Sequence, residues 1–322
     1  TDATNNDPGP PQVAEDAMRA LVAENPRYAR GWGGLALLQY RRSLRPREGR
    51  DALLLDAERL AARALALDPG QPDALAVIAA QACREQRWSD CLAQSRRVVR
   101  LAPSDVAMRQ MLALHLASTG RLDEAMAQIG EAVALDPASP HVQLTLGRLL
   151  DTQGRHVEAR AALARAMPER SQTARLHNAL WREDLADARR ITDAMLAGDH
   201  WRGSAVATLD ALGDPARWPE AIAAIEATEA QASPEGEHVT YNFMRLWLPE
   251  RDFARDIAGL DQAQRDGYST YQLVLWQPQS RALRQTPAFQ AYLRDSGLLA
   301  HWRQDGWPAQ CRPDGEDAAR CD

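Results

Sequence analysis

Lysine is missing from this 322-residue sequence, so all 38 basic residues are arginine, against 44 acidic residues and a formal net charge of -6. Arginine presents a planar group with five donors, which suits carboxylates and phosphates. General binding of nucleic acid depends on an excess of positive charge that neutralises many phosphates. The negative balance therefore argues against direct nucleic-acid binding by this segment.

Long apolar runs are missing as well. No stretch reaches the roughly 18 consecutive apolar residues that a membrane-spanning helix needs. The sequence starts at Thr1 with the polar run TDATNNDPGPPQ and shows no signal peptide. We expect residues 1–11 to be a disordered linker, and the chain to be the mature or truncated product of a longer protein. Any membrane attachment would then come through a missing upstream segment.

Catalytic and metal-binding signatures are absent from the sequence. Its seven histidines are scattered without an HExxH pattern, and neither a GxSxG elbow nor a phosphate-binding P-loop occurs. Residues 31–34 (GWGG) are rich in glycine. No predicted strand precedes them, so they fit close helix packing better than a dinucleotide-binding loop. We therefore expect a protein that is not an enzyme and that has no cofactor and no resident metal ion.

Cysteine is scarce, and its four copies form two pairs that are local in sequence, Cys83 with Cys91 and Cys311 with Cys321. Their spacings match no structural zinc signature, which favours cysteines two to four residues apart or close histidine partners. Both pairs are candidate disulfides, which would place the chain in an oxidising compartment such as the periplasm. Four free thiols in a cytoplasmic protein are the alternative that the sequence leaves open.

Helix-forming residues are plentiful and strand formers are few, which predicts an all-α fold. Pro69, Pro103 and Pro137 each follow a Leu-Asp or Leu-Ala pair, where they would end a helix because proline lacks an N–H group. They recur at an interval of about 34 residues, the tetratricopeptide period. Gly120 and Arg121 mark a turn between two helical segments inside one such interval. The chain thus resembles the tetratricopeptide repeat family over residues 12–171.

This resemblance implies an α-solenoid of helix-turn-helix repeats with a helical C-terminal cap. Small residues such as Ala57 and Gly147 recur where the two helices of a repeat must approach closely. We expect helix pairs at 29–68, 72–102, 106–136 and 140–167, with an inserted loop at 41–50. The predicted regions are a linker at 1–11, the repeat array at 12–171, and degenerate helical repeats with the cap at 172–322, of which 172–196 are helical.

The first helix of each repeat lines the concave face of such an array, so its positions predict a ligand-binding groove. The predicted groove residues are Arg30, Leu37, Tyr40, Arg41, Arg84, Gln110, Leu114, His141, Leu144 and Arg148. Four arginines with apolar side chains between them favour a protein or peptide partner of acidic character. The asparagine and lysine pattern of the family's carboxylate clamp is absent. A solvated face whose charges have no partner is the alternative.

The sequence at 275–311 carries a second resemblance. LWQPQSRALRQTPAFQAYL, followed by GLLAHWRQDGWPAQC, is similar to the end of tetratricopeptide sensor domains in membrane-anchored winged-helix transcription regulators of proteobacteria. In that family the repeat domain lies in the periplasm, beyond one membrane span. The resemblance implies a non-catalytic sensor or interaction domain. Two alternatives stand beside it: a free-standing scaffold or assembly protein, and the non-catalytic part of a truncated enzyme.

Overall fold

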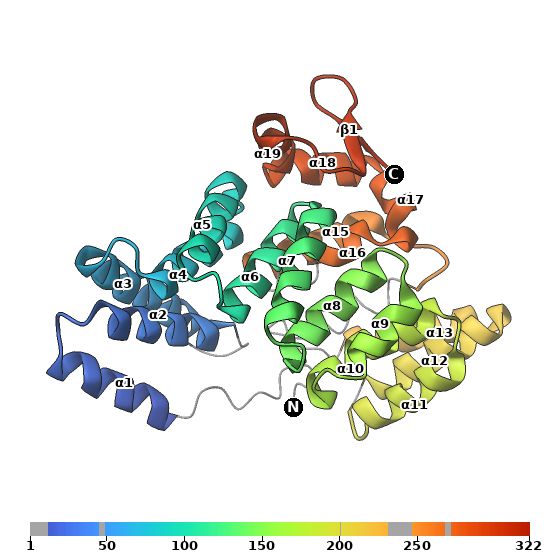
Figure 1. Ribbon diagram of the computed structural model, residues 1–322. Coiled ribbons are helices and arrows are strands. Elements are labelled where there is room, and N and C mark those ends of the chain that lie inside the picture. The colour runs from blue at the N-terminus through green and yellow to red at the C-terminus, as the bar shows by residue number, and fades with distance from the viewer. Residues whose placement is uncertain (1–11, 45–48, 200, 231–246, 268–271) are drawn as a thin grey trace. The chain divides into compact units, whose positions relative to one another are not determined.

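The computed structural model describes residues 12–44, 49–199, 201–230, 247–267 and 272–322, and most of them are helical (Figure 1). The linker predicted at 1–11 lies outside the described residues. The chain divides into two compact units. The amino-terminal unit holds the described residues of Asp7–Asp136, Gln262–Leu273 and Gln290–Asp322, and the middle unit holds those of Pro137–Asp261 and Val274–Phe289.

Three helix pairs build the amino-terminal unit after a first helix, α1 (Gln12–Glu24). They are α2 (Ala29–Ser43) with α3 (Arg50–Leu67), α4 (Pro72–Arg84) with α5 (Trp88–Leu101), and α6 (Val106–Ser118) with α7 (Leu122–Leu135). The pairs predicted at 29–68, 72–102 and 106–136 are confirmed. The inserted loop begins later than predicted, because α2 continues through Ser43, whose hydroxyl donates to the carbonyl of Tyr40 over 2.7 Å. Residues 45–48 of that loop lie outside the described residues.

Three more pairs build the middle unit. They are α8 (Pro140–Thr152) with α9 (His156–Leu163), α10 (Pro168–Trp181) with α11 (Leu185–Met195), and α12 (Arg202–Gly213) with α13 (Trp218–Glu229). The pair predicted at 140–167 is confirmed. Residues 172–196 are helical as predicted, but they belong to two helices separated by a turn at residues 182–184.

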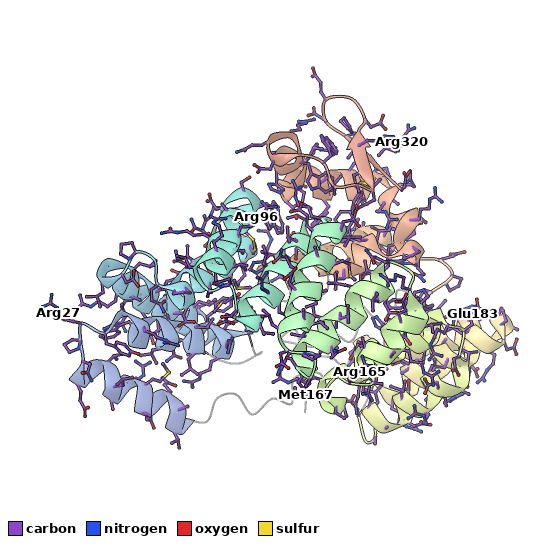
Figure 2. All side chains as sticks on the ribbon, in the orientation of Figure 1. Arg27, Arg96, Arg165, Met167, Glu183 and Arg320 are labelled. Carbon is purple, nitrogen blue, oxygen red and sulfur yellow. A yellow bond between two sulfur atoms is a disulfide. The ribbon has the colours of Figure 1, made fainter. Side chains whose placement is uncertain are left out.

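In the three helix pairs from α4 to α9 and in the α10–α11 pair, the turn contains one residue with a left-handed backbone. Gly120 and Gly154 supply it with φ of 80° and 74°, which glycine adopts without steric cost. Gln86 and Glu183 take the same role with φ of 59° and 58° (Glu183 is labelled in Figure 2). Left-handed backbone is costly for residues with a Cβ. The repeat packing therefore imposes this conformation at the two turns that lack glycine.

Five α-helices and two short strands with described bounds follow the last helix pair. They are α15 (Phe253–Arg265), α16 (Leu273–Trp276), α17 (Arg281–Arg284), α18 (Pro287–Asp295), α19 (Leu298–Asp305), and the antiparallel strands β1 (Cys311–Pro313) and β2 (Ala319–Cys321). Thr286 caps α18, because its hydroxyl accepts from the backbone N–H of Phe289 over 3.2 Å. Among the described residues, no helix is both long enough and apolar enough to cross a membrane.

The carboxy-terminal segment, defined here as residues 290–310, docks on the repeat turns of the amino-terminal unit. The indole N–H of Trp88 donates to the carbonyl of Ser296 over 2.7 Å, and the indole N–H of Trp302 donates to the carbonyl of Thr119 over 2.9 Å. Arg121, beside the second turn, donates to two carbonyls at the end of α19. The turns that connect α4 to α5 and α6 to α7 are thus held by residues roughly 200 positions away in sequence.

Both candidate cysteine pairs are joined as disulfides. Cys83 ends α4 and Cys91 lies one turn into α5, with their Cα atoms 5.0 Å apart. Cys311 and Cys321 face each other across β1 and β2, with Cα atoms 4.1 Å apart. Both separations are below the 7 Å or so above which a bridge cannot form without backbone movement.

A substitution at Gly147 of α8 tests how closely the paired helices α8 and α9 approach each other. A Cβ at this position would lie 2.6 Å from Cγ of the fully buried Leu163 in α9. Gly147→Ala should therefore destabilise the chain by about 1–3 kcal/mol in urea denaturation, the usual range for an overpacked core. Gly130→Ala in α7 is the matched control, because a Cβ there meets nothing within 4 Å. It should stabilise by about 0.5–1 kcal/mol. Equal effects of the two changes would contradict the close packing.

The two disulfides predict how many free thiols the unfolded protein exposes before and after reduction. Unfolded, unreduced protein should expose no titratable thiol to a chromogenic disulfide reagent, whereas reduced protein should expose all four cysteines. Replacing Cys311 and Cys321 together by serine should lower the free energy of unfolding by about 2–3 kcal/mol, because the tail loop regains freedom in the unfolded state. Four thiols in the unreduced protein would show that neither bridge forms.

Candidate binding surface

The first helices of successive repeats line one surface of the amino-terminal unit. Leu37 of α2 and Met111 of α6 pack on a core cluster that contains Ala76 of α4, so the three helices are neighbours. We call this surface the first-helix face. It is defined by the predicted groove residues of α2, α4 and α6: Arg30, Leu37, Tyr40, Arg41, Arg84, Gln110 and Leu114.

Arg30 and Arg41 are the exposed cationic groups of this face. They are 11 residues apart on α2, which is close to three full helical turns, so they lie on the same side of the helix. Neither guanidinium group forms an ion pair with any residue that the structure describes. Leu37 lies between them along the helix and is half-buried, and Gln110 and Leu114 of α6 are half-buried too. These five residues are the exposed or half-buried residues of the first-helix face other than Arg84.

The chain's own residues 264–267 cover another part of the face. Gln264 donates to the carbonyl of Cys83 over 2.9 Å, and the guanidinium of Arg84 donates to the carbonyl of Arg265 over 3.0 Å. Tyr40 is buried nearby, which raises the pKa of its phenol to about 12. Of the predicted groove residues, Tyr40 thus lies in the core and Arg84 makes a hydrogen bond within the chain.

The remaining predicted groove residues belong to α8 in the middle unit. Leu144 is only 9% exposed and packs in a core cluster with Leu163. His141 is exposed, and its Nε2 accepts a hydrogen bond from Arg170 over 3.2 Å. Arg148 is half-buried, and its charge adds to the burial that holds the pKa of His177 well below its usual value. The middle unit therefore offers no apolar and basic stripe comparable with that of α2 among its described first helices.

A buried carboxyl group in the middle unit was not anticipated from the sequence. Asp151 is 1% exposed and accepts hydrogen bonds from Asn178 over 2.7 Å and from His156 Nδ1 over 2.9 Å. The His156 ring stacks on Trp181 with centroids 5.6 Å apart. Burial raises the pKa of Asp151 to about 6, against the hydrogen bonds of His156 and Asn178, which lower it. No short motif links these residues, because three different helices supply them.

A second buried group joins two repeats of the amino-terminal unit. Cys83, Cys91 and His115 each offer a side-chain atom within 4.8 Å of the others. Burial lowers the pKa of His115 to about 4, so its ring is neutral at pH 7. The sequence spacing gave no signal for this group, because His115 comes from the repeat that follows the two cysteines.

The pKa of Asp151 predicts a specific dependence of stability on pH. Between its ordinary pKa of 3.8 and its folded pKa of about 6, the folded chain binds more protons than the unfolded chain. The contribution of Asp151 to stability therefore falls as pH rises through this window. Asp151→Asn keeps the shape and removes the charge. Its stability relative to wild type should rise by up to about 3 kcal/mol from about pH 4 to pH 7, measured by urea denaturation.

Asp123→Asn is the control for this measurement, because Asp123 is an exposed carboxylate on α7. Its stability difference from wild type should show no comparable rise. A difference for Asp151→Asn that stays constant, or that falls as pH rises, would contradict the assigned environment of Asp151.

Two tetratricopeptide repeat family models match the sequence, one over residues 82–140 and one over residues 116–183. Repeats of this kind are typically non-catalytic and bind proteins or peptides. No curated protein matches the chain.

Solved structures of repeat proteins are similar at low sequence identity. A tetratricopeptide repeat protein from Parabacteroides merdae is 14% identical, with a TM-score of 0.48, over 74% of this chain and 98% of that one. PilW, a type IV pilus biogenesis factor, is 19% identical, with a TM-score of 0.47, over 62% and 96% of the two chains. YrrB, described as having an unusual peptide-binding site, is 17% identical, with a TM-score of 0.40, over 58% and 96%. The family models thus identify tetratricopeptide repeats within residues 82–183, and the helix pairs on either side continue the same helix-turn-helix arrangement.

Proposed function

We propose that this protein binds an acidic segment of a partner protein on the accessible part of the first-helix face. The observation that supports this most is the pair of exposed guanidinium groups of Arg30 and Arg41, which form no ion pair with the described residues, with the half-buried Leu37 between them. Two arginines on the second helices form ion pairs instead. Arg96 of α5 (Figure 2) lies 2.7 Å from Glu124, and Arg59 of α3 lies 2.6 Å from Asp56.

The spacing of the two arginines sets the length of the proposed ligand. Eleven residues of α-helix place Arg30 and Arg41 about 16 Å apart along α2. An extended peptide covers that distance in roughly five residues. A ligand with two acidic residues five positions apart and an apolar residue between them would contact Arg30, Leu37 and Arg41 together. Gln110 and Leu114 of α6 would then add a polar and an apolar contact.

We also propose that the chain is the sensor or interaction domain of a membrane-anchored regulator. The support for this is the resemblance of residues 275–311 to the end of periplasmic sensor domains, together with two disulfides, which persist in oxidising compartments. A free-standing scaffold or assembly protein with the same peptide surface is the alternative. Mapping the partner's compartment would separate the two: a periplasmic partner favours the sensor domain, and a cytoplasmic partner excludes it.

The ligand class is tested with an array of short peptides that carry two glutamates five positions apart around a leucine, beside scrambled and lysine-substituted versions. Wild-type protein should prefer the glutamate peptides, and binding should weaken as salt rises, because exposed ion pairs are screened. Arg30→Ala combined with Arg41→Ala should lower the affinity by about 1–3 kcal/mol per lost charge-assisted hydrogen bond.

Arg59→Ala combined with Arg96→Ala is the matched control, since it removes the same charge from the second helices. It should leave peptide affinity nearly unchanged. Equal losses in the two double variants would show that only the net charge matters, and unaltered binding by the Arg30 and Arg41 variant would rule out this surface.

A further inference from the structure

The buried group of Cys83, Cys91 and His115 has the composition of a metal site. The three residues come from the end of α4, the first turns of α5 and the last turns of α6. Their exposed fractions are 2%, 0% and 6%, and their candidate ligand atoms all lie within 4.8 Å of one another. Among the described residues, no other group of three such side chains meets this spacing.

Ser95 gives His115 the orientation that a metal ligand needs. The hydroxyl of Ser95 donates its proton to the carbonyl of Cys91 over 2.7 Å, and its oxygen lies 2.8 Å from Nδ1 of His115. Because the serine proton is already used, its oxygen must accept from Nδ1–H. The neutral ring then keeps its lone pair on Nε2. Metal-binding histidines typically have such a partner on their other nitrogen.

We propose that, when the bond between Cys83 and Cys91 is reduced, the two thiolates and Nε2 of His115 bind one thiophilic cation with a filled d shell, of the Cu(I) or Zn(II) class. This inference is independent of the proposed peptide surface. A dithiol reductant supplies two electrons and two protons to the disulfide and is itself oxidised to a disulfide. Cation binding then displaces the two thiol protons. The disulfide and the metal complex exclude each other, because both use the same sulfur electrons.

The donor set and the spacing agree with this class of cation. Two sulfurs and one imidazole nitrogen are soft or borderline ligands, which favour Cu(I) and Zn(II) over Mg²⁺ or Ca²⁺. Metal–ligand bonds of about 2.0–2.3 Å place the ligand atoms of one cation about 3.5–4 Å apart. A group whose atoms span at most 4.8 Å therefore needs only small side-chain shifts, beyond the parting of the two sulfurs on reduction.

Metal binding at this position would join two consecutive repeats. Cys83 and Cys91 belong to the α4–α5 pair, whereas His115 belongs to the α6–α7 pair. The disulfide by itself links only α4 to α5. The carbonyl of Cys83 also accepts the hydrogen bond from Gln264. A bound cation would thus stabilise the packing between repeats, and this stabilisation would grow with the logarithm of the ratio of cation concentration to dissociation constant.

The test uses the full chain with Cys311 and Cys321 replaced by serine, so that only the proposed site can supply two thiols. The protein is reduced with a phosphine under anaerobic conditions and titrated with Cu(I) against a chromogenic Cu(I) chelator, and separately with Zn²⁺ against a chromogenic Zn²⁺ chelator. We expect one equivalent of at least one of the two cations to bind per reduced chain, and none to bind the oxidised chain. Cys83→Ser combined with Cys91→Ser should abolish binding.

Two further variants test the nitrogen ligand and its orientation. Ser95→Ala should weaken binding roughly 10- to 100-fold, the usual effect of losing the hydrogen-bond partner of a ligand. His115→Gln should weaken it by more. Each variant is checked for complete formation of the Cys83–Cys91 bond after reoxidation, which shows that α4 and α5 still pair. In the reduced parent protein, a ¹¹³Cd²⁺ probe should show scalar coupling to the His115 ring protons.

Three results would overturn the proposal. They are the absence of stoichiometric binding by the reduced chain, equal affinity of the oxidised and reduced chains, and unchanged affinity in His115→Gln together with no cadmium coupling to its ring. The last result would leave a simple dithiol that binds metal without the repeat-joining histidine.

Discussion

Two buried indole N–H groups hold the carboxy-terminal segment on the repeats of the amino-terminal unit. Trp88 and Trp302 are both fully buried, and each donates to a main-chain carbonyl on the other side of the contact. An unpaired buried donor costs about 1–3 kcal/mol, so separating the segment from the repeat turns would leave two such donors to be solvated again. Trp88 and Trp302 are also the largest fully buried side chains among the described residues. The segment is therefore part of the folded repeat structure rather than an appendage.

A different stretch of the chain, residues 264–267, covers part of the first-helix face. Residues 264–267 lie against the ends of α2 and α4. There the guanidinium of Arg84 donates to the carbonyl of Arg265, and Gln264 donates to the carbonyl of Cys83. What stays accessible is the basic and apolar stripe of α2, together with Gln110 and Leu114 of α6. The same arrangement leaves the sulfurs of Cys83 and Cys91 enclosed beside His115, where their chemistry depends on the redox state. Peptide binding and metal binding would thus use different parts of neighbouring helices.

The helix pairs were predictable from the sequence because proline, glycine and small residues mark their ends and contacts at a fixed interval. Pro103 and Gly120 are such local signals. The turn at Glu183 was not predictable in the same way, because no glycine marks its left-handed backbone. The contact of Arg84 with Arg265 could not be foreseen either, since the two residues are 181 positions apart in sequence. For the same reason, His115 gave no metal signal by spacing from the cysteines, and only the stacking of repeats brings it there.

Hydrogen exchange of the tryptophan indole groups tests the docking of the carboxy-terminal segment most directly. The indole N–H signals, assigned with Trp88→Phe and Trp302→Phe variants, are followed by nuclear magnetic resonance after transfer into D₂O. Those of Trp88 and Trp302 should exchange orders of magnitude more slowly than that of Trp32, which donates to Pro26 at an exposed site. If both exchange as fast as Trp32 in a chain that retains its helical circular dichroism, the carboxy-terminal segment does not dock on the repeat turns and this account of the amino-terminal unit is wrong.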